Sequence, residues 1–170
     1  MRGDARHVDA TKLHLGAKGR HRGVAFVVRG RLTLRHSSGT TWSEWYASFA
    51  DGRGGWIAPS KGRAVVTFEA AFPPLRSLAM GKPVWPAYVV EEKGRARYES
   101  AEGVLPFAPP FGESYAYADL VAPDGAFATL DYSESPPRLF VGEATTLEAL
   151  KIVPRPRETR KPAPKRGRTG

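Results

Sequence analysis

Two stretches of the sequence resemble each other, and each consists of short segments with strand periodicity separated by turns. Residues 13–39 and 78–103 share a leucine-rich start, an aromatic-Val-Val segment and similarly spaced glycines. The similarity continues, because Tyr46-Ala47 matches Tyr115-Ala116 and Asp51-Gly52 matches Asp124-Gly125. A self-similar chain indicates a repeated structural unit whose copies bury their apolar faces together. We therefore interpret the body of the chain as an internal duplication of a small β unit.

The segments within each copy have the composition and period of β-strands. Residues 24–35 are rich in β-branched and aromatic side chains, and Gly30 within them predicts a bulge or a bend. The Asp-Gly pairs predict tight turns. The further predicted strands span residues 42–49, 55–58, 64–69, 126–132 and 138–141.

Helix signals are scarce in this sequence. Residues 146–152 predict one short helix, because Thr145 and Glu148 have the spacing of a capping box. The predicted fold class is all-β, with two related small barrel or half-barrel units from the duplication, this C-terminal helix and a disordered basic tail.

Charge is distributed unevenly along the 170 residues, which carry a formal net charge of +9. The first 35 residues hold nine basic and two acidic side chains, whereas residues 36–153 hold ten basic and fourteen acidic ones. The basic, proline-rich C-terminus cannot bury enough apolar surface to offset the entropy of ordering. We divide the chain into a flexible N-terminus (1–12), a first β unit (13–71), a second β unit (72–152) that may share its core with the first, and a disordered basic tail (153–170).

Composition excludes several classes of protein. The sequence has no cysteine, which excludes disulfides, thiol nucleophiles and Cys-based zinc sites and fits a reducing compartment. No window approaches the roughly 18 apolar residues of a membrane-spanning helix. The first 16 residues have no apolar stretch typical of a secretory signal. We therefore expect a cytoplasmic protein without a transmembrane segment.

No constellation of residues predicts catalysis, a metal or a cofactor. The four histidines all lie within the first 36 residues, and three of them (His7, His14 and His21) are spaced seven apart. Nearby glycines argue against a helix there, and on strands this spacing alternates faces, so the three would not converge on a metal. No nucleophile elbow or phosphate-binding loop is present. We expect a protein without enzyme activity, metal or cofactor.

An aromatic strand is the strongest local feature. Along residues 42–49, Trp42, Glu44 and Tyr46 fall on one face, and the opposite face carries Trp45 and Phe49, which we expect in the core. The first face, together with Trp56, is either covered by another element of a barrel or exposed as a recognition strip.

A proline-rich loop is the second candidate surface. Leu105, Phe107 and Phe111 belong to a stiff apolar segment, residues 105–111, with three prolines. This loop either lies across the barrel or presents an apolar surface to a partner.

The basic tail is the third candidate. Its positive charge predicts either a solvated tail or an electrostatic arm for nucleic acid or another anionic surface. The residues that carry this charge are Arg155, Arg157, Arg160, Lys161, Lys165, Arg166 and Arg168.

Three segments resemble the bacterial domain-of-unknown-function 4178 family. These are the run from Thr41 to Gly62 with its W-x-E-W-Y element, the GVLPF loop (103–107) and the segment from Ala128 to Leu150. The resemblance covers roughly residues 13–152. It implies a mainly β domain without assigned activity, catalytic residues or cofactor, and an accessory role beside membrane-stress and polyamine-related gene products. Some members carry a Cys-rich zinc ribbon, which this chain lacks.

These observations favour a non-catalytic interaction module that binds another protein through the aromatic face, the 105–111 loop or an open strand edge. Two alternatives stay open. One is nucleic-acid binding through the basic ends, and the other is a small-ligand or enzymatic barrel that uses Glu44 or a buried carboxylate between the two units. The sequence does not indicate an oligomeric state.

Overall fold

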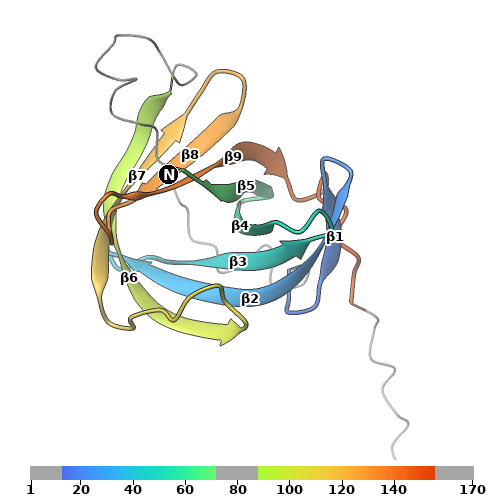
Figure 1. The fold of residues 1–170 in the computed structure, drawn as a ribbon, viewed down its shortest axis with the longest axis horizontal. Helices are drawn as coiled ribbons and strands as arrows, with labels where there is room; N and C mark the ends of the chain where they lie inside the picture. Colours follow the sequence, from blue (N-terminus) through green and yellow to red (C-terminus); the bar gives the residue numbers. More distant parts are fainter. Residues whose placement is uncertain (1–12, 72–87, 156–170) are drawn as a thin grey trace, which may run out of the picture.

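The computed structural model describes residues 13–71 and 88–155, and within them the chain forms nine strands (Figure 1). They confirm the predicted all-β class and nearly all of the predicted segments. Their bounds are β1 Lys18–His21, β2 Val24–His36, β3 Thr41–Phe49, β4 Gly54–Ser60, β5 Arg63–Ala70, β6 Val89–Gly103, β7 Ser114–Val121, β8 Ala126–Asp131 and β9 Arg138–Thr146.

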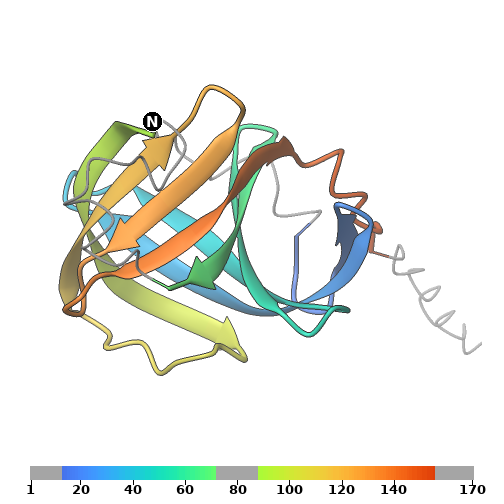
Figure 2. The same ribbon diagram turned by 45° about the horizontal axis from the view of Figure 1, so that its top comes forward.

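Eight of these strands close into one antiparallel barrel. Strands β2 to β5 pair in order, as do β6 to β9, and the two sets meet at two seams where β5 pairs with β9 and β2 pairs with β6. Figure 2 shows β9 running beside β5 along one of these seams. Both halves of the chain therefore build one wall around a shared interior. A closed barrel leaves none of its eight strands with a fully unpaired edge.

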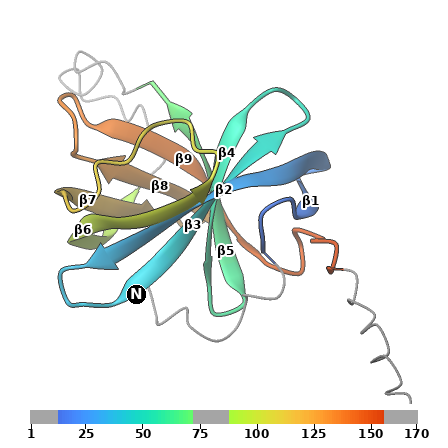
Figure 3. The same cartoon turned by 90° about the horizontal axis from the view of Figure 1, so that it is seen from below.

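Strand β2 is long enough to pair with two different strands along one edge (Figure 3). Its first residues pair with β1, and from Gly30 onward it pairs with β6. The β2–β3 register shifts between Val28 and Gly30, which confirms the bulge predicted there. Because a bulge adds one residue, it reverses which face the following residues occupy. Val28 consequently packs outside the barrel, whereas Leu32 and Leu34 pack inside it.

A second apolar layer covers the outer face of β2–β5. Leu13, Ala17, Leu147 and Leu150 from the two ends of the described chain are buried there against the outward side chains of the barrel. Backbone hydrogen bonds between β1 and residues 150–153 fix the two ends to each other. These four strands are therefore apolar on both faces.

The predicted helix over residues 146–152 is wrong, because residues 147–151 form a turn. The backbone N–H of Lys151 donates to the carbonyl of Glu148, and that of Ala149 donates to Thr146 Oγ1 at 3.1 Å. A helix this short has little stability of its own, so packing decides the conformation. The turn places Leu147 and Leu150 in the outer apolar layer.

The β2–β6 seam places two arginines opposite each other. Arg35 faces Arg97 in the register of the two strands, and like charges in this position repel. The carboxylate of Glu99 accepts hydrogen bonds from Arg35 at 2.8 Å and from Arg97 at 2.6 Å. The hydrogen bond from Arg35 has the largest effect on this carboxyl group, and together with the bond from Arg97 it lowers the pKa of Glu99 to about 2.

We expect Glu99 to make the barrel sensitive to acid. A carboxyl group whose pKa is lower in the folded chain stabilises the fold above its ordinary value of 4.5, and this contribution disappears as the pH falls toward about 2. Glu99→Gln should therefore lower the melting temperature at neutral pH and flatten its decline across this acid range. Thermal melts from neutral pH down to this range measure both effects, with exposed Glu113→Gln as the control. Identical curves for the two variants would contradict a stabilising bridge.

Candidate functional site

Aromatic side chains from both halves of the chain line the interior of the barrel, which we call the lumen. Within this wall the ring centroids lie 4.9 Å apart for Tyr98 and Tyr115 and 6.1 Å apart for Trp42 and Tyr117. These distances are typical of favourable aromatic pairs. The luminal rings are Trp42, Trp56, Tyr98, Phe107, Tyr115, Tyr117, Phe127 and Phe140.

The lumen contains two adjoining cavities. The first, which we call the inner chamber, has a volume of about 60 Å³ and reaches Phe107 and Arg138. The second, the outer chamber, has about 390 Å³ and opens beside the start of β6. Ala58, Val65 and Phe127 line both chambers, so the two are parts of one interior.

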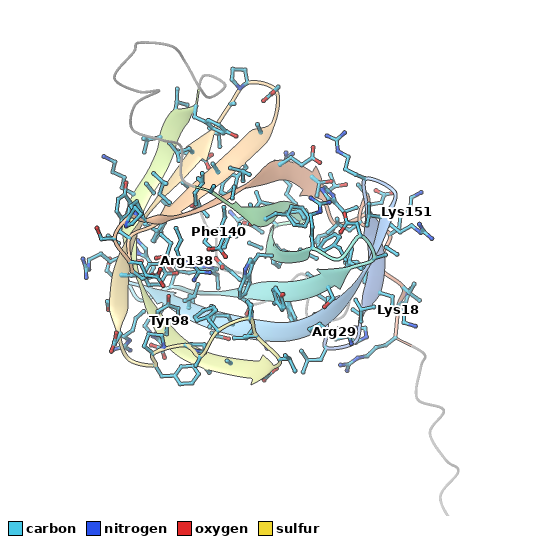
Figure 4. The ribbon with its side chains drawn as sticks, in the orientation of Figure 1. Lys18, Arg29, Tyr98, Arg138, Phe140 and Lys151 are labelled. Atoms are coloured by element: carbon cyan, nitrogen blue, oxygen red, sulfur yellow. The ribbon has the colours of Figure 1, made fainter. Side chains whose placement is uncertain are left out.

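Three charged side chains face the inner chamber: Glu44, Asp131 and Arg138. Glu44 Oε1 accepts a hydrogen bond from the Trp42 indole N–H at 2.9 Å. Arg138 donates two hydrogen bonds of 3.0 Å to Glu69, and its guanidinium lies 5.1 Å from the ring centroid of Phe140. The hydrogen bond from Arg138 lowers the pKa of Glu69. Figure 4 shows Arg138 and Phe140 within the ring of strands.

Tyr98 brings a buried phenol to the same chamber (Figure 4). Its side chain is almost inaccessible, with a residue exposure of 5%. Burial, and secondly the negative charge of Asp131, raise the pKa of Tyr98 to about 12. The phenol therefore stays protonated at neutral pH and adds no charge to the chamber.

The outer chamber is lined by both charged and aromatic side chains. Glu91, Glu92, Asp119 and Arg63 face it, together with the Trp42 ring. The Tyr117 hydroxyl donates to Glu92 Oε1 at 3.0 Å. Asp119 is only 2% exposed, so its carboxyl group lies in a poorly hydrated part of the chamber.

The loop after β6 lies across the barrel, which is one of the two arrangements predicted for it. Leu105 and Phe107 pack against the luminal aromatic cluster, whereas Phe111 is exposed. The loop approaches β2 so closely that a Cβ atom on Gly30 would lie 2.3 Å from the carbonyl oxygen of Val104. Glycine at position 30 is thus required for the loop to cover this end.

The predicted aromatic face of β3 lines the interior of the barrel. Trp42 is 6% exposed, and Glu44 and Trp56 line the inner chamber. Tyr46 lies beside Trp56, with 5.3 Å between the ring centroids. The alternative in which this face is an exposed recognition strip is wrong, because the closed barrel covers it. On the other face of β3, Trp45 packs in the outer apolar layer rather than in the lumen.

The remaining predicted residues lie away from the lumen. Arg155 is exposed, and the other basic residues of the tail, like His7, lie outside the described residues. His21 Nε2 lies 3.1 Å from Glu143 Oε1 on the outer surface. Within residues 13–71 and 88–155, no three His, Asp or Glu side chains are arranged to hold a metal ion.

Sequence reasoning missed most of the luminal residues contributed by the second half of the chain. Tyr115, Tyr117 and Asp119 alternate with alanines and a leucine along β7, and this period of two was the available signal. Arg138 carried no comparable signal, because its luminal position depends on the pairing of β9 with β5.

Comparison with known proteins identifies the family. Neither a curated protein nor a solved structure matches the chain. No helix in the two described ranges is long and apolar enough to cross a membrane. The model of the domain of unknown function DUF4178 matches residues 14–146, which include all eight strands of the barrel. The chain therefore belongs to the DUF4178 family.

Proposed function

We propose that the lumen binds a small organic molecule. The observation that carries this proposal is the pair of adjoining chambers, walled by aromatic rings, covered at one end by Phe107 and open at the other. Binding sites for small molecules are concave and mostly apolar, with a few polar groups that orient the ligand. The interior of an eight-stranded barrel is either filled by side chains or holds one small ligand, and the two chambers support the second arrangement here.

This proposal favours one of the alternatives left open by the sequence. A protein partner could still contact exposed Phe111 or a strand edge, and nucleic acid could still bind the basic ends, so both stay predictions. Neither draws on the luminal residues, whereas a small ligand uses the aromatic face of β3, the Phe107 loop and the acidic side chains together.

We expect a neutral aromatic probe to enter the lumen. N-phenylnaphthylamine should gain emission when it is added to a Trp45→Phe, Trp85→Phe variant, in which Trp42 and Trp56 are the remaining tryptophans. Excitation of these two should transfer energy to the bound probe. Ala58→Phe, which fills the junction of the chambers, should weaken binding about tenfold or more. A fluorescence titration measures each affinity.

Ser114→Phe provides the matched control, because Ser114 is an exposed residue of β7. It adds the same ring to the outer surface and should leave the affinity unchanged. Equal weakening by both variants, or no binding by the unmodified barrel, would contradict a luminal site.

We also propose that the two halves of the barrel arose by duplication. The first strands of the halves, β2 and β6, pair with each other, as do the last strands, β5 and β9. Gly30 lies opposite Tyr46 in one half, and Gly94 lies opposite Tyr117 in the other. Such pairing is what two equivalent units related by a twofold axis would form, and it supports matching Tyr46 with Tyr117 rather than with Tyr115.

A further inference from the structure

The acidic side chains of the barrel gather around its lumen. Five carboxylates face the two chambers, and only two arginines do. One of these arginines, Arg138, has its charge matched by two hydrogen bonds to a further acid, Glu69. The lumen is therefore net negative, although the whole chain is strongly basic.

The outer face of the β2–β6 seam has the opposite charge. Four arginines lie on this face, Arg31 and Arg35 on β2 and Arg95 and Arg97 on β6, together with two acids, Glu99 and Glu102. Glu99 bridges one arginine from each strand, and the four arginines against two acids leave the face net positive. Opposite charges are thus sorted to the two sides of one sheet. Such sorting gives the lumen a field that attracts cations, and its poorly hydrated walls strengthen that field.

The aromatic walls favour the same kind of ligand. The faces of Trp, Tyr and Phe rings attract cations through the ring quadrupole, and the attraction grows when water is excluded. The barrel already contains one such contact, because the Arg138 guanidinium lies 5.1 Å from the Phe140 ring centroid and 5.6 Å from that of Phe107. The rings of Phe107 and Phe140 can therefore contact a positively charged group.

Neighbouring side chains orient the luminal carboxylates. The Trp42 indole N–H donates a hydrogen bond to Glu44, and the Tyr117 hydroxyl donates one to Glu92. Each donor fixes a carboxylate beside an aromatic ring without neutralising its charge. In the inner chamber Asp131 adds a second carboxylate beside the Tyr98 ring.

We propose that the ligand of the lumen is an organic cation, a substituted ammonium group on a short apolar body. The inference rests on the proposed function, since it names the chemical class of ligand for the same site. The cationic head would lie against the aromatic rings beside Glu44 and Asp131, and the body would extend toward Val65 and Phe127 in the outer chamber.

Three probes of nearly the same shape test the charge of the ligand. Choline carries a positive charge, dimethylbutanol replaces its nitrogen by carbon and is neutral, and dimethylbutyrate is an anion. We expect choline to bind at least about tenfold more tightly than dimethylbutanol, and dimethylbutyrate to bind most weakly. Titrations of the tryptophan indole N–H signals by NMR report binding at Trp42 and Trp56 directly.

Variants at the luminal carboxylates test which side chains cause the preference for a cation. Glu44→Gln keeps an acceptor for the Trp42 indole and, like Asp131→Asn, should weaken choline at least about fivefold while dimethylbutanol is unaffected. Glu99→Gln removes one negative charge from the outer face instead and should leave choline binding unchanged. Retained binding of N-phenylnaphthylamine shows that each variant keeps an intact lumen.

The outcomes separate this inference from the proposed function. If N-phenylnaphthylamine binds in the lumen but choline binds no better than dimethylbutanol, the cation inference is overturned and the small-molecule site stands. Tighter binding of the anion overturns the inference as well. If no probe binds, both proposals fail.

Discussion

Gly142→Ala is expected to destabilise the barrel by about 3 kcal/mol, the upper end of the usual cost of overpacking, because the added atom meets backbone that cannot rotate away. A Cβ atom built on Gly142 would lie 1.8 Å from the carbonyl oxygen of Val66. That atom belongs to the β5 backbone at the β5–β9 seam, where Gly142 lies opposite Thr67. The side chain can be accommodated only if one strand moves, and the ladder between the two halves then opens locally.

Thermal unfolding measures this cost. For a chain of this length we expect the melting temperature to fall by about 10 °C. The reverse exchange two residues away, Ala144→Gly, is the control and should cost no more than about 1 kcal/mol. An unchanged melting temperature for Gly142→Ala would show that the two strands can move apart at the seam, which would contradict this prediction. Because β9 also carries Arg138 and Phe140, the variant should bind N-phenylnaphthylamine more weakly as well.

Local pattern was sufficient to predict most of the strands. Alternation along residues 42–49 correctly placed Trp42, Glu44 and Tyr46 on one face and Trp45 and Phe49 on the other. This succeeded because the side-chain period of a strand is a property of the backbone alone. The position of the bulge at Gly30 was predictable for the same local reason.

Which face would be inside the barrel was not predictable. The expectation that Trp45 and Phe49 are buried in a core is confirmed, but that core is the outer apolar layer, which the two ends of the described chain cover. Both faces of β3 are apolar, so hydrophobic pattern alone does not distinguish the lumen from a covered outer face. The distinction depends on the closure of the barrel through the β2–β6 and β5–β9 pairs, which are distant in sequence.

The clustering of charges in the lumen could not be predicted from the sequence, for a related reason. The excess of acid in residues 36–153 was evident, but carboxylates spread over β3, β6, β7 and β8 converge only after the ring closes. Arg35 and Arg97 lie in different halves of the chain, and their contact at one seam was equally invisible. A net charge counted along a segment does not reveal which side of a sheet carries each sign.

Replacement of Trp42 by alanine is expected to affect both stability and binding, whereas the same replacement at Trp45 should affect stability alone. The two tryptophans lie on one strand, are 6% and 8% exposed, and face the lumen and the outer apolar layer respectively. Each truncation removes a large buried ring, so each should cost about 3–5 kcal/mol in urea unfolding. Trp42→Phe should cost less, because it keeps a ring and loses chiefly the hydrogen bond to Glu44.

Ligand binding should separate the two positions. Trp42→Ala removes part of the wall of the outer chamber and frees Glu44 from its donor, so N-phenylnaphthylamine should bind about tenfold more weakly. Trp45→Ala leaves the lumen unchanged and should retain the original affinity, provided that titrations are made well below the melting temperature of each variant. Equal losses of affinity would mean that binding reports only the integrity of the fold. A loss confined to Trp42 would place the ligand on the inner face of β3, beside the carboxylate that its indole holds.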